Sequence, residues 1–218
     1  EILDEYSHDA WPVSALEKKM EIHQFRPDIV VTPRSKKEIL GVLKVAKDNQ
    51  VPIMARGLGS SVTGQSLPTQ GGIVLDLSKI VSEPVLSISD MTVSASAGMR
   101  GSDLEEWLNK KSLTMNFFPQ SLSRSTIGGW VATRATGQLS TKFGGIEESA
   151  VGFSVILSDS TEIQVGQKPR AAVGPNLKEL FLGTEGMFAV ITEVTLKVYR
   201  KSEIQLSEAW LMPSVNSG

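Results

Sequence analysis

Several residue types that carry particular chemistries are missing or scarce in this sequence of 218 residues. Cysteine is absent, which excludes disulfides, thiolate catalysis, iron–sulfur ligation and cysteine-based zinc sites within it. Only two histidines occur, His8 and His23, both near the amino end. They are too few and too peripheral to indicate a metal centre, so we predict no metal site and a structural or surface role for both.

Strong charge bias and long apolar runs are also missing. The formal net charge is −2 and the basic residues are scattered, so the positive stripe of a nucleic-acid-binding protein is absent and we predict no such partner. No apolar run approaches the ~20 residues of a membrane span, so we predict no transmembrane segment. A hydrophobic share of 40% suits a globular core. We take a cytoplasmic location as the default and leave homo-oligomerisation open.

The first half of the sequence predicts a βαβ unit with parallel strands. Residues 29–31 form a β-branched run before a proline, as in a short strand. Ser35 is followed three residues later by a glutamate, the spacing of a capping box, and apolar residues recur at helical spacing through about residue 49. Further strands are expected at 51–55 and 73–77.

The second half predicts a mainly antiparallel arrangement. We expect a half-buried strand at 93–97, and a helix opened by Ser102 with a second glutamate at capping-box spacing. A hairpin is expected over 151–165, then a helix over 175–181 with its proline in the first turn. In a last strand over 190–198, alternate residues from Val190 to Val198 are expected to share one face. The predicted fold class is α+β: a small βαβ subdomain plus a mainly antiparallel sheet with flanking helices.

The strongest local signal for a ligand is the glycine- and hydroxyl-rich run 56–64, directly after a predicted strand. Glycines allow the backbone to turn tightly, so that N–H groups approach an anion, while Arg56 adds a permanent charge at the edge. These are the donors that a pyrophosphate needs. By composition alone a flexible surface turn is an equal alternative. The glycine spacing fits neither a Walker loop nor a Rossmann fingerprint.

Two more segments are candidates for ligand contact. Residues 119–137 place hydroxyl residues ahead of Gly128 and Gly129 at an expected helix start, where orphan N–H groups are available. The alternative is that these glycines serve close packing of the helix, and either glycine could do both. Residues 182–191 hold two glycines before the last strand, which alone would indicate an ordinary loop.

Together these segments resemble the FAD-binding domain of the vanillyl-alcohol oxidase type, also called the p-cresol methylhydroxylase type. The nearest branch holds the D-lactate dehydrogenases, the glycolate oxidase FAD subunit and alkyl-dihydroxyacetone-phosphate synthase. The run Trp130–Gly137 is most similar to the synthase, and Leu3–Asp9 is more similar to the glycolate and lactate enzymes. The resemblance covers about residues 26–199 and includes residues 26–28, 31–35, 56–64, 71–78, 125–137, 143–148 and 183–186.

The resemblance implies a bound FAD and a set of contacts to it. Ser60 stands where some members attach FAD through a histidine, so a non-covalent flavin is expected. Residues 187–189 depart from the family's usual Thr-Leu-Gly, which puts close backbone contact at Ala189 in doubt. The implied cofactor-binding residues are Ala55, Arg56, Gly57, Leu58, Gly59, Ser60, Ser61, Gly64, Gln120, Ser121, Ser123, Ser125, Thr126, Gly128, Gly129, Trp130, Ala132, Thr133, Gly137, Glu185, Gly186, Val190 and Ile191.

The implied organisation is an N-terminal extension (1–25), two FAD-binding subdomains (26–82 and 83–202) and the start of a substrate-binding cap domain (203–218). The alternative for the last segment is an edge strand of the present domain. The implied function is flavin-dependent oxidation of a small 2-hydroxy acid such as D-lactate or glycolate, by hydride transfer to the flavin. Three alternatives stay open: a synthase-like flavin transferase, a non-catalytic FAD-carrying subunit and a cofactor-free binding module. The small-molecule substrate would be held by the cap domain or a partner subunit, so we name no catalytic residue and expect this chain alone to be inactive.

Overall fold

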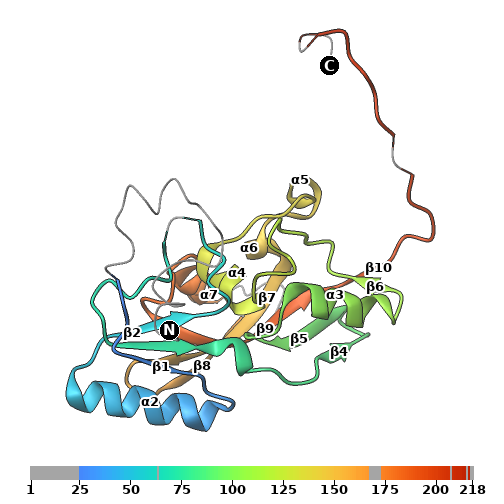
Figure 1. Ribbon diagram of the computed structural model, residues 1–218. Helices are drawn as coiled ribbons and strands as arrows, with labels where there is room; N and C mark the ends of the chain where they lie inside the picture. Colours follow the sequence, from blue (N-terminus) through green and yellow to red (C-terminus); the bar gives the residue numbers. More distant parts are fainter. Residues whose placement is uncertain (1–24, 63, 167–172, 207, 215, 217–218) are drawn as a thin grey trace.

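In the computed structural model, a parallel sheet and a larger antiparallel sheet both pack against one long helix (Figure 1). The structure describes residues 25–62, 64–166, 173–206, 208–214 and 216. The predicted extension, including the two histidines and the run Leu3–Asp9, lies outside the described residues apart from Phe25. The predicted α+β class is confirmed. Among the described residues, no helix combines the length and the apolar character that crossing a bilayer requires.

The amino-terminal part is the predicted βαβ unit. Strands β1 (Ile29–Val31), β2 (Ile53–Arg56) and β3 (Ile73–Asp76) are parallel in the order β1-β3-β2. A short 3-10 helix, η3 (Leu77–Lys79), follows β3. The glycine-rich run therefore leaves the carboxyl end of an edge strand, β2, whose last residue lies opposite the last residue of β3.

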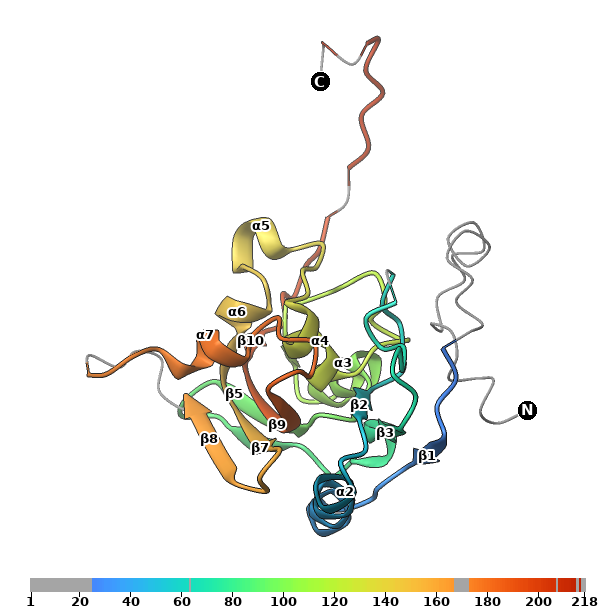
Figure 2. The same cartoon turned by 90° about the vertical axis from the view of Figure 1, so that its left-hand side faces the viewer.

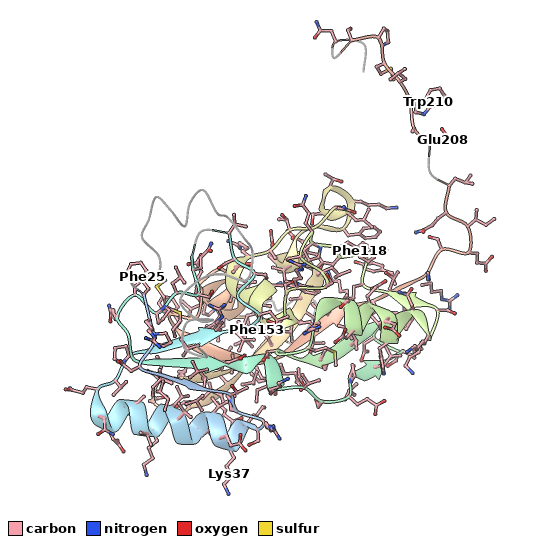
Figure 3. All side chains as sticks on the ribbon, in the orientation of Figure 1. Phe25, Lys37, Phe118, Phe153, Glu208 and Trp210 are labelled. Atoms are coloured by element: carbon pink, nitrogen blue, oxygen red, sulfur yellow. The ribbon has the colours of Figure 1, made fainter. Side chains whose placement is uncertain are left out.

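Helix α2 (Lys36–Asn49) connects β1 to β2 and begins as predicted, with the Ser35 Oγ accepting the Glu38 amide at 3.3 Å. Only half of the predicted capping box forms, because the Glu38 carboxylate accepts the amide of Arg34 at 2.7 Å instead of that of Ser35. On the inner face, Ile39 is fully buried, whereas Lys37 extends outward from the helix (Figure 3).

The second sheet is antiparallel, in the order β4-β5-β9-β7-β8. The predicted hairpin is the pair β7–β8. A further two-stranded ladder joins β6 (Leu113–Thr114) to β10 (Tyr199–Arg200). The strands of the larger sheet are β4 (Val85–Ser87), β5 (Thr92–Ser96), β7 (Ala150–Leu157), β8 (Glu162–Gly166) and β9 (Ala189–Lys197). The helices of this part are α3 (Gly101–Asn109), α4 (Ile127–Thr133), α5 (Ser140–Phe143), α6 (Ile146–Ser149) and α7 (Leu177–Phe181).

The antiparallel sheet carries a hydrophobic core on each face. One core packs α3 and α4 against β5, β7 and β9, with Phe153 among its members. The other core packs α2 and β3 against Ile156 and Val190 from the same two central strands. Because successive residues of a strand point to opposite faces, α2 and α4 cover opposite faces of this sheet, as Figure 2 shows.

Two predicted helix starts differ in the structure. Helix α3 has Arg100 at its N-cap without a side-chain cap, so the predicted capping box at Ser102 is wrong. The Glu105 carboxylate, 8% exposed, instead accepts bonds from the Thr114 hydroxyl at 2.6 Å and the Met115 amide at 3.0 Å. Helix α7 begins at Leu177, so the proline at 175 precedes the helix.

Strand β9 does not keep one alternating face, because a β-bulge interrupts it. Ser154 pairs with Glu193 and Val155 pairs with Ile191, so Thr192 is the extra residue. A single inserted residue reverses which side chains face which layer. Ile191 therefore faces the α4 side and Val190 faces α2, so the prediction that Val190 shares a face with residues 194–198 is wrong.

The segment after β10 forms no strand among its described residues. Its apolar side chains are exposed, with Leu211 fully so. Figure 3 shows Glu208 and Trp210 on an extended stretch that leads away from the body. The alternative of an edge strand of this domain is therefore wrong for the described part of 203–218.

Candidate functional site

A cavity of about 320 Å³ opens between the two parts of the fold. Four segments bound it: the end of β2 with the loop 57–62, the turn around Ser121, helix α4, and the loop that leads into β9. The predicted residues that line it are Ala55, Arg56, Gly57, Leu58, Gly59, Ser60, Ser61, Ser121, Ser125, Thr126, Gly128, Gly129, Trp130, Ala132, Thr133, Glu185, Gly186 and Ile191.

The loop after β2 presents unused backbone donors. The amides of Gly57 to Ser60 donate to no acceptor among the described residues. Gly59 has φ of +64°, whereas Leu58 and Ser60 keep negative φ. Such a change of sign turns successive N–H groups toward one side, which makes an anion-binding concavity. The loop thus has the donors that the sequence predicted for a diphosphate.

Arg56 lies beneath this loop instead of at its edge. The side chain is 6% exposed, and its guanidinium sits where a side chain on Gly59 would be, 2.2 Å from an added Cβ. It donates to the Ser66 hydroxyl at 3.4 Å. Arg56 therefore supports Gly59 from the protein side and contributes a buried positive charge under the free amides.

The start of α4 is arranged differently from the prediction. The amides of Ile127 and Gly128 donate to the carbonyls of Met99 (3.0 Å) and Ala97 (2.8 Å). Gly129 donates to the Thr126 hydroxyl at 3.2 Å, and the next amide donates to the Thr126 carbonyl. The expectation of orphan N–H groups at this helix start is therefore wrong, because the protein itself accepts from the first turn. This wall offers a ligand a smooth surface instead of amide donors.

The two glycines of α4 differ in role, one serving close packing and the other lying beside the cavity. An added Cβ on Gly128 would lie 2.6 Å from the Cβ of Ala97, so Gly128 serves close packing against the end of β5. An added Cβ on Gly129 would meet only the Thr126 Oγ1, at 3.1 Å. Gly129 therefore faces open space beside the cavity.

Trp130 lines the cavity while being 2% exposed. Its indole N–H donates to the Ser125 hydroxyl at 2.7 Å, and that hydroxyl donates to the Ser121 carbonyl at 2.8 Å. The ring lies against Phe117 edge-on and against Gly101, where an added Cβ would be 2.2 Å away. Trp130 thus holds the turn 121–125 in place from within the core.

The third glycine segment closes the opposite end of α4. The Gly183 amide donates to the Val131 carbonyl at 3.0 Å, and the Glu185 amide donates to the Ala132 carbonyl at 2.9 Å. Glu185 is an exposed non-glycine residue at φ of +53°, a conformation that costs about 1 kcal/mol or more. Ala189, which the family departure put in doubt, lines the cavity with a small side chain.

Five predicted residues lie outside the cavity lining. Gly64 has φ of +80° and packs on Leu67, and Gly137 packs on the backbone of Phe118. Gln120 and Ser123 are exposed residues of the turns between Pro119 and Arg124. Val190 faces α2 because of the bulge in β9.

The lining also includes residues that sequence reasoning missed. Gln65 and Ser66 directly follow the glycine loop, so extending that motif by two residues would have found them. Val62, Ala135 and Ala189 lie within the runs 56–64, 119–137 and 182–191 but were not named as contacts, whereas the positions of Leu77 and Ala97 depend on the tertiary fold. The full missed set is Val62, Gln65, Ser66, Leu77, Ala97, Ala135 and Ala189.

The titratable groups with shifted pKa values lie away from the cavity lining. Burial lowers the pKa of Lys178, whose ammonium donates to the carbonyls of Glu147 and, at 3.1 Å, Ala150. A bond from Lys110 lowers the pKa of exposed Glu106. Arg56 and Glu185 are the charged residues of the lining. Across the described ranges, no cluster of three potential metal-ligating residues exists.

The arrangement fits a ligand with an anionic part and a flat, largely apolar part. The free amides over Arg56 suit the anion, while alanines and Ile191 provide a smooth wall of small side chains. A mostly apolar cavity with a few convergent polar groups is typical of cofactor sites. A dinucleotide with a diphosphate and an aromatic ring system meets both requirements.

Comparison with known proteins leads to the same ligand class. A family described as FAD binding domain matches residues 27–166. Alkyldihydroxyacetonephosphate synthase of Caenorhabditis elegans is 34% identical over 196 residues, which are 88% of this chain and 33% of the relative. The mitochondrial D-lactate dehydrogenase [cytochrome] of Arabidopsis thaliana is 33% identical over 80% of this chain and 30% of its own length. Glycolate oxidase subunit GlcD of Bacillus subtilis is 30% identical over 91% and 40%.

Solved structures agree with the sequence relatives. Two structures of alkyldihydroxyacetonephosphate synthase match with TM-scores of 0.73 and 0.74, at 31% and 30% identity. They cover 80% and 84% of this chain, and 32% and 36% of their own chains. The chain thus spans about a third of the length of the relatives it matches. These findings confirm the predicted resemblance and FAD as the cofactor: the chain belongs to the FAD-binding domain family that flavin-dependent oxidoreductases share.

Proposed function

We propose that the cavity holds FAD, with the diphosphate on the loop 57–61 and the ring system toward α4 and the start of β9. The observation that carries this assignment is the set of free amides from Gly57 to Ser60, set against a helix start whose amides are all used. An anion placed at the loop gains donors that have no other partner among the described residues. An anion at α4 would compete with bonds that the protein already makes.

Each wall then has a separate task. The loop and buried Arg56 neutralise the diphosphate, and the turn held by Trp130 places the Ser121 region at the far side of the cavity. The small residues of α4 and β9 leave room for a planar ring and keep water from it. Bound FAD supplies an acceptor for a hydride from a carbon–hydrogen bond. The chain's own contribution is to bind and orient the cofactor.

We further propose that the whole protein oxidises a small 2-hydroxy acid of the D-lactate or glycolate type. Support comes from the similarity to a D-lactate dehydrogenase and to a glycolate oxidase subunit. The described residues of the cavity include no histidine, and its charged residues are buried Arg56 and Glu185 at the rim. The groups that bind and deprotonate the substrate would come from a cap domain or a partner subunit, so residues 1–218 alone are expected to bind FAD without turnover.

A second candidate function is a flavin-dependent alkyl transfer of the synthase type. The run Trp130–Gly137 and the match to solved synthase structures favour it. The two functions differ in net redox change, because hydroxy-acid oxidation consumes an electron acceptor and alkyl transfer does not. The whole protein should therefore be assayed with D-lactate and glycolate against a reducible dye. Reduction of the dye supports hydroxy-acid oxidation. Exchange of an acyl for an alkyl group without dye reduction supports the transferase function.

The FAD assignment is tested on the chain 1–218 by its visible absorption and by FAD titration. Gly59→Ala adds a methyl group that collides with the Arg56 guanidinium in a left-handed backbone, and should weaken FAD binding at least about tenfold. Gly174→Ala is the matched control, because it has φ of +77° and no atom within 4 Å of an added Cβ. It should show similar backbone strain with unchanged affinity. Equal FAD affinity of the two variants would contradict the assignment.

A further inference from the structure

Gly57, the first residue of the glycine loop, rests directly on the side chain of Thr126. An added Cβ on Gly57 would lie 2.3 Å from the Thr126 Oγ1, with the Thr126 Cγ2 at 3.3 Å and Cβ at 3.4 Å. No backbone atom of any other segment is among these nearest atoms. Gly57 does not have positive φ, so its backbone conformation is open to any residue. A methyl group at position 57 would therefore meet the outer part of the Thr126 side chain first.

Thr126 connects the two parts of the fold at this point. It is 3% exposed, and its hydroxyl accepts the Gly129 amide as the N-cap of α4. The same oxygen faces Gly57, at the end of the parallel sheet. Helix α4 is in turn fixed to the residue directly after β5 by the hydrogen bond from the Gly128 amide to the Ala97 carbonyl. The Thr126 side chain therefore links the position of the glycine loop to the antiparallel part of the molecule.

We infer that Thr126 is a positioning residue, which sets the height of the glycine loop so that its amides reach the anion. Position 57 is glycine because Thr126 occupies the space of a side chain there, and not because the ligand requires that space. This inference rests on the proposed FAD site for its binding assay. If Thr126 positions the loop, the effects of Gly57→Ala and Thr126→Ala on FAD binding depend on each other. Direct contact of each residue with the ligand would not make them do so.

This dependence follows from the contact between position 57 and the Thr126 side chain. Gly57→Ala places a methyl group against Oγ1, so the loop has to rise and its amides leave their places. Thr126→Ala removes Oγ1 and Cγ2, and leaves the remaining Cβ at 3.4 Å, an ordinary van der Waals distance. The double variant therefore has room for both methyl groups. Two residues that each touched the ligand independently would instead give additive losses.

The experiment is a double-mutant cycle on the chain 1–218, with the FAD dissociation constant and the thermal midpoint without FAD measured for each protein. Gly57→Ala should weaken FAD binding at least about tenfold, equivalent to ~1.4 kcal/mol. Thr126→Ala should weaken it less. The double variant should bind FAD better than Gly57→Ala and close to Thr126→Ala. Thr126→Ser keeps Oγ1 and should therefore bind FAD more tightly than Thr126→Ala does.

A second helix cap serves as the control for a merely structural role of Thr126. Ser35→Ala removes the N-cap bond of α2, which is not part of the cavity lining, and should lower the thermal midpoint about as much as Thr126→Ala does, without changing FAD affinity. If Gly57→Ala does not fold, recovery of a folded double variant supports the inference.

Different outcomes test the positioning role of Thr126 and the FAD site. A double variant that binds FAD no better than Gly57→Ala, or a Gly57→Ala protein that binds as the wild type does, overturns the positioning role while the FAD site stands. A wild-type chain that binds no FAD refutes the proposed function. The thermal midpoints then still decide the Gly57–Thr126 contact, which fails if the midpoint losses simply add.

Discussion

The neighbouring glycines of α4 should separate stability from ligand binding, although both substitutions are the same change in the same helix. Gly128→Ala directs its methyl group at the Cβ of Ala97, at 2.6 Å, and at the Ala97 carbonyl, at 3.1 Å. Gly129→Ala has only the Thr126 Oγ1 within 4 Å, and its methyl group takes space beside the cavity.

The expected magnitudes follow from these contacts. Overpacking against a fixed neighbour costs ~1–3 kcal/mol, and weakening the Gly128–Ala97 hydrogen bond adds about 1 kcal/mol. Replacing a helical glycine returns up to about 1 kcal/mol. Gly128→Ala should therefore lose about 2 kcal/mol, or roughly 4–8 °C in the thermal midpoint for a chain of this size. Gly129→Ala should keep its midpoint within about 3 °C and weaken FAD binding about tenfold.

Both variants are measured in the same way, by thermal unfolding without FAD and by FAD titration of the folded protein. We expect Gly128→Ala to be impaired mainly in stability and Gly129→Ala mainly in FAD affinity. A Gly128→Ala protein as stable as the wild type would refute the packing role of that glycine. Undiminished FAD affinity in Gly129→Ala would refute the position of the ring system along α4.

Three further predictions concern other parts of the chain. Glu105→Gln should lower the unfolding free energy by ~2–3 kcal/mol in urea titrations, because the carboxylate accepts from Thr114 and Met115 with separate oxygens and the amide keeps only one acceptor oxygen; an unchanged midpoint contradicts this. Burial lowers the pKa of Lys178 in the folded state, so the unfolded chain holds that proton to higher pH and stability gains as pH rises toward 10.5. Lys178→Met should lose this gain between pH 8 and 10, and parallel pH profiles would argue against it. With Ser60 at the attachment position, acid precipitation should leave the flavin in the supernatant; colour in the pellet would indicate a covalent link.

Much of the architecture could be predicted because it depends on local patterns. The β-branched run at 29–31 and the helical spacing after Ser35 define the βαβ unit, and the turn between 151 and 165 defines the hairpin. The glycine loop was found for the same reason, since its unusual backbone needs glycine at position 59. In these segments the residues that determine the conformation lie next to the conformation they determine.

The errors share a different cause, because each depends on partners far away in the sequence. The first amides of α4 are used by carbonyls near the end of β5, and nothing within residues 119–137 indicates this. Glu105 leaves the expected capping role because Thr114 and the following amide offer it buried donors. The face of Val190 depends on a bulge opposite Val155.

The predicted domain boundaries and the cofactor contacts remain predictions. A division near residue 82 separates the two sheets in sequence, yet α2 packs against both sheets in one core. The cofactor contacts place most of the predicted residues around one cavity, and a structure with FAD bound or the variants above would test each residue. Neither question depends on the family membership.

Helix α4 has one more consequence for how this protein reaches its working form. With seven residues it is too short to persist by itself, and other segments bind both of its ends, residues 97–99 after β5 at the start and residues 183–185 at the finish. Those two segments are separated by more than eighty positions along the chain. This wall can therefore assemble only when nearly the whole polypeptide has come together, so capture of the flavin should report complete maturation and not an early folding intermediate.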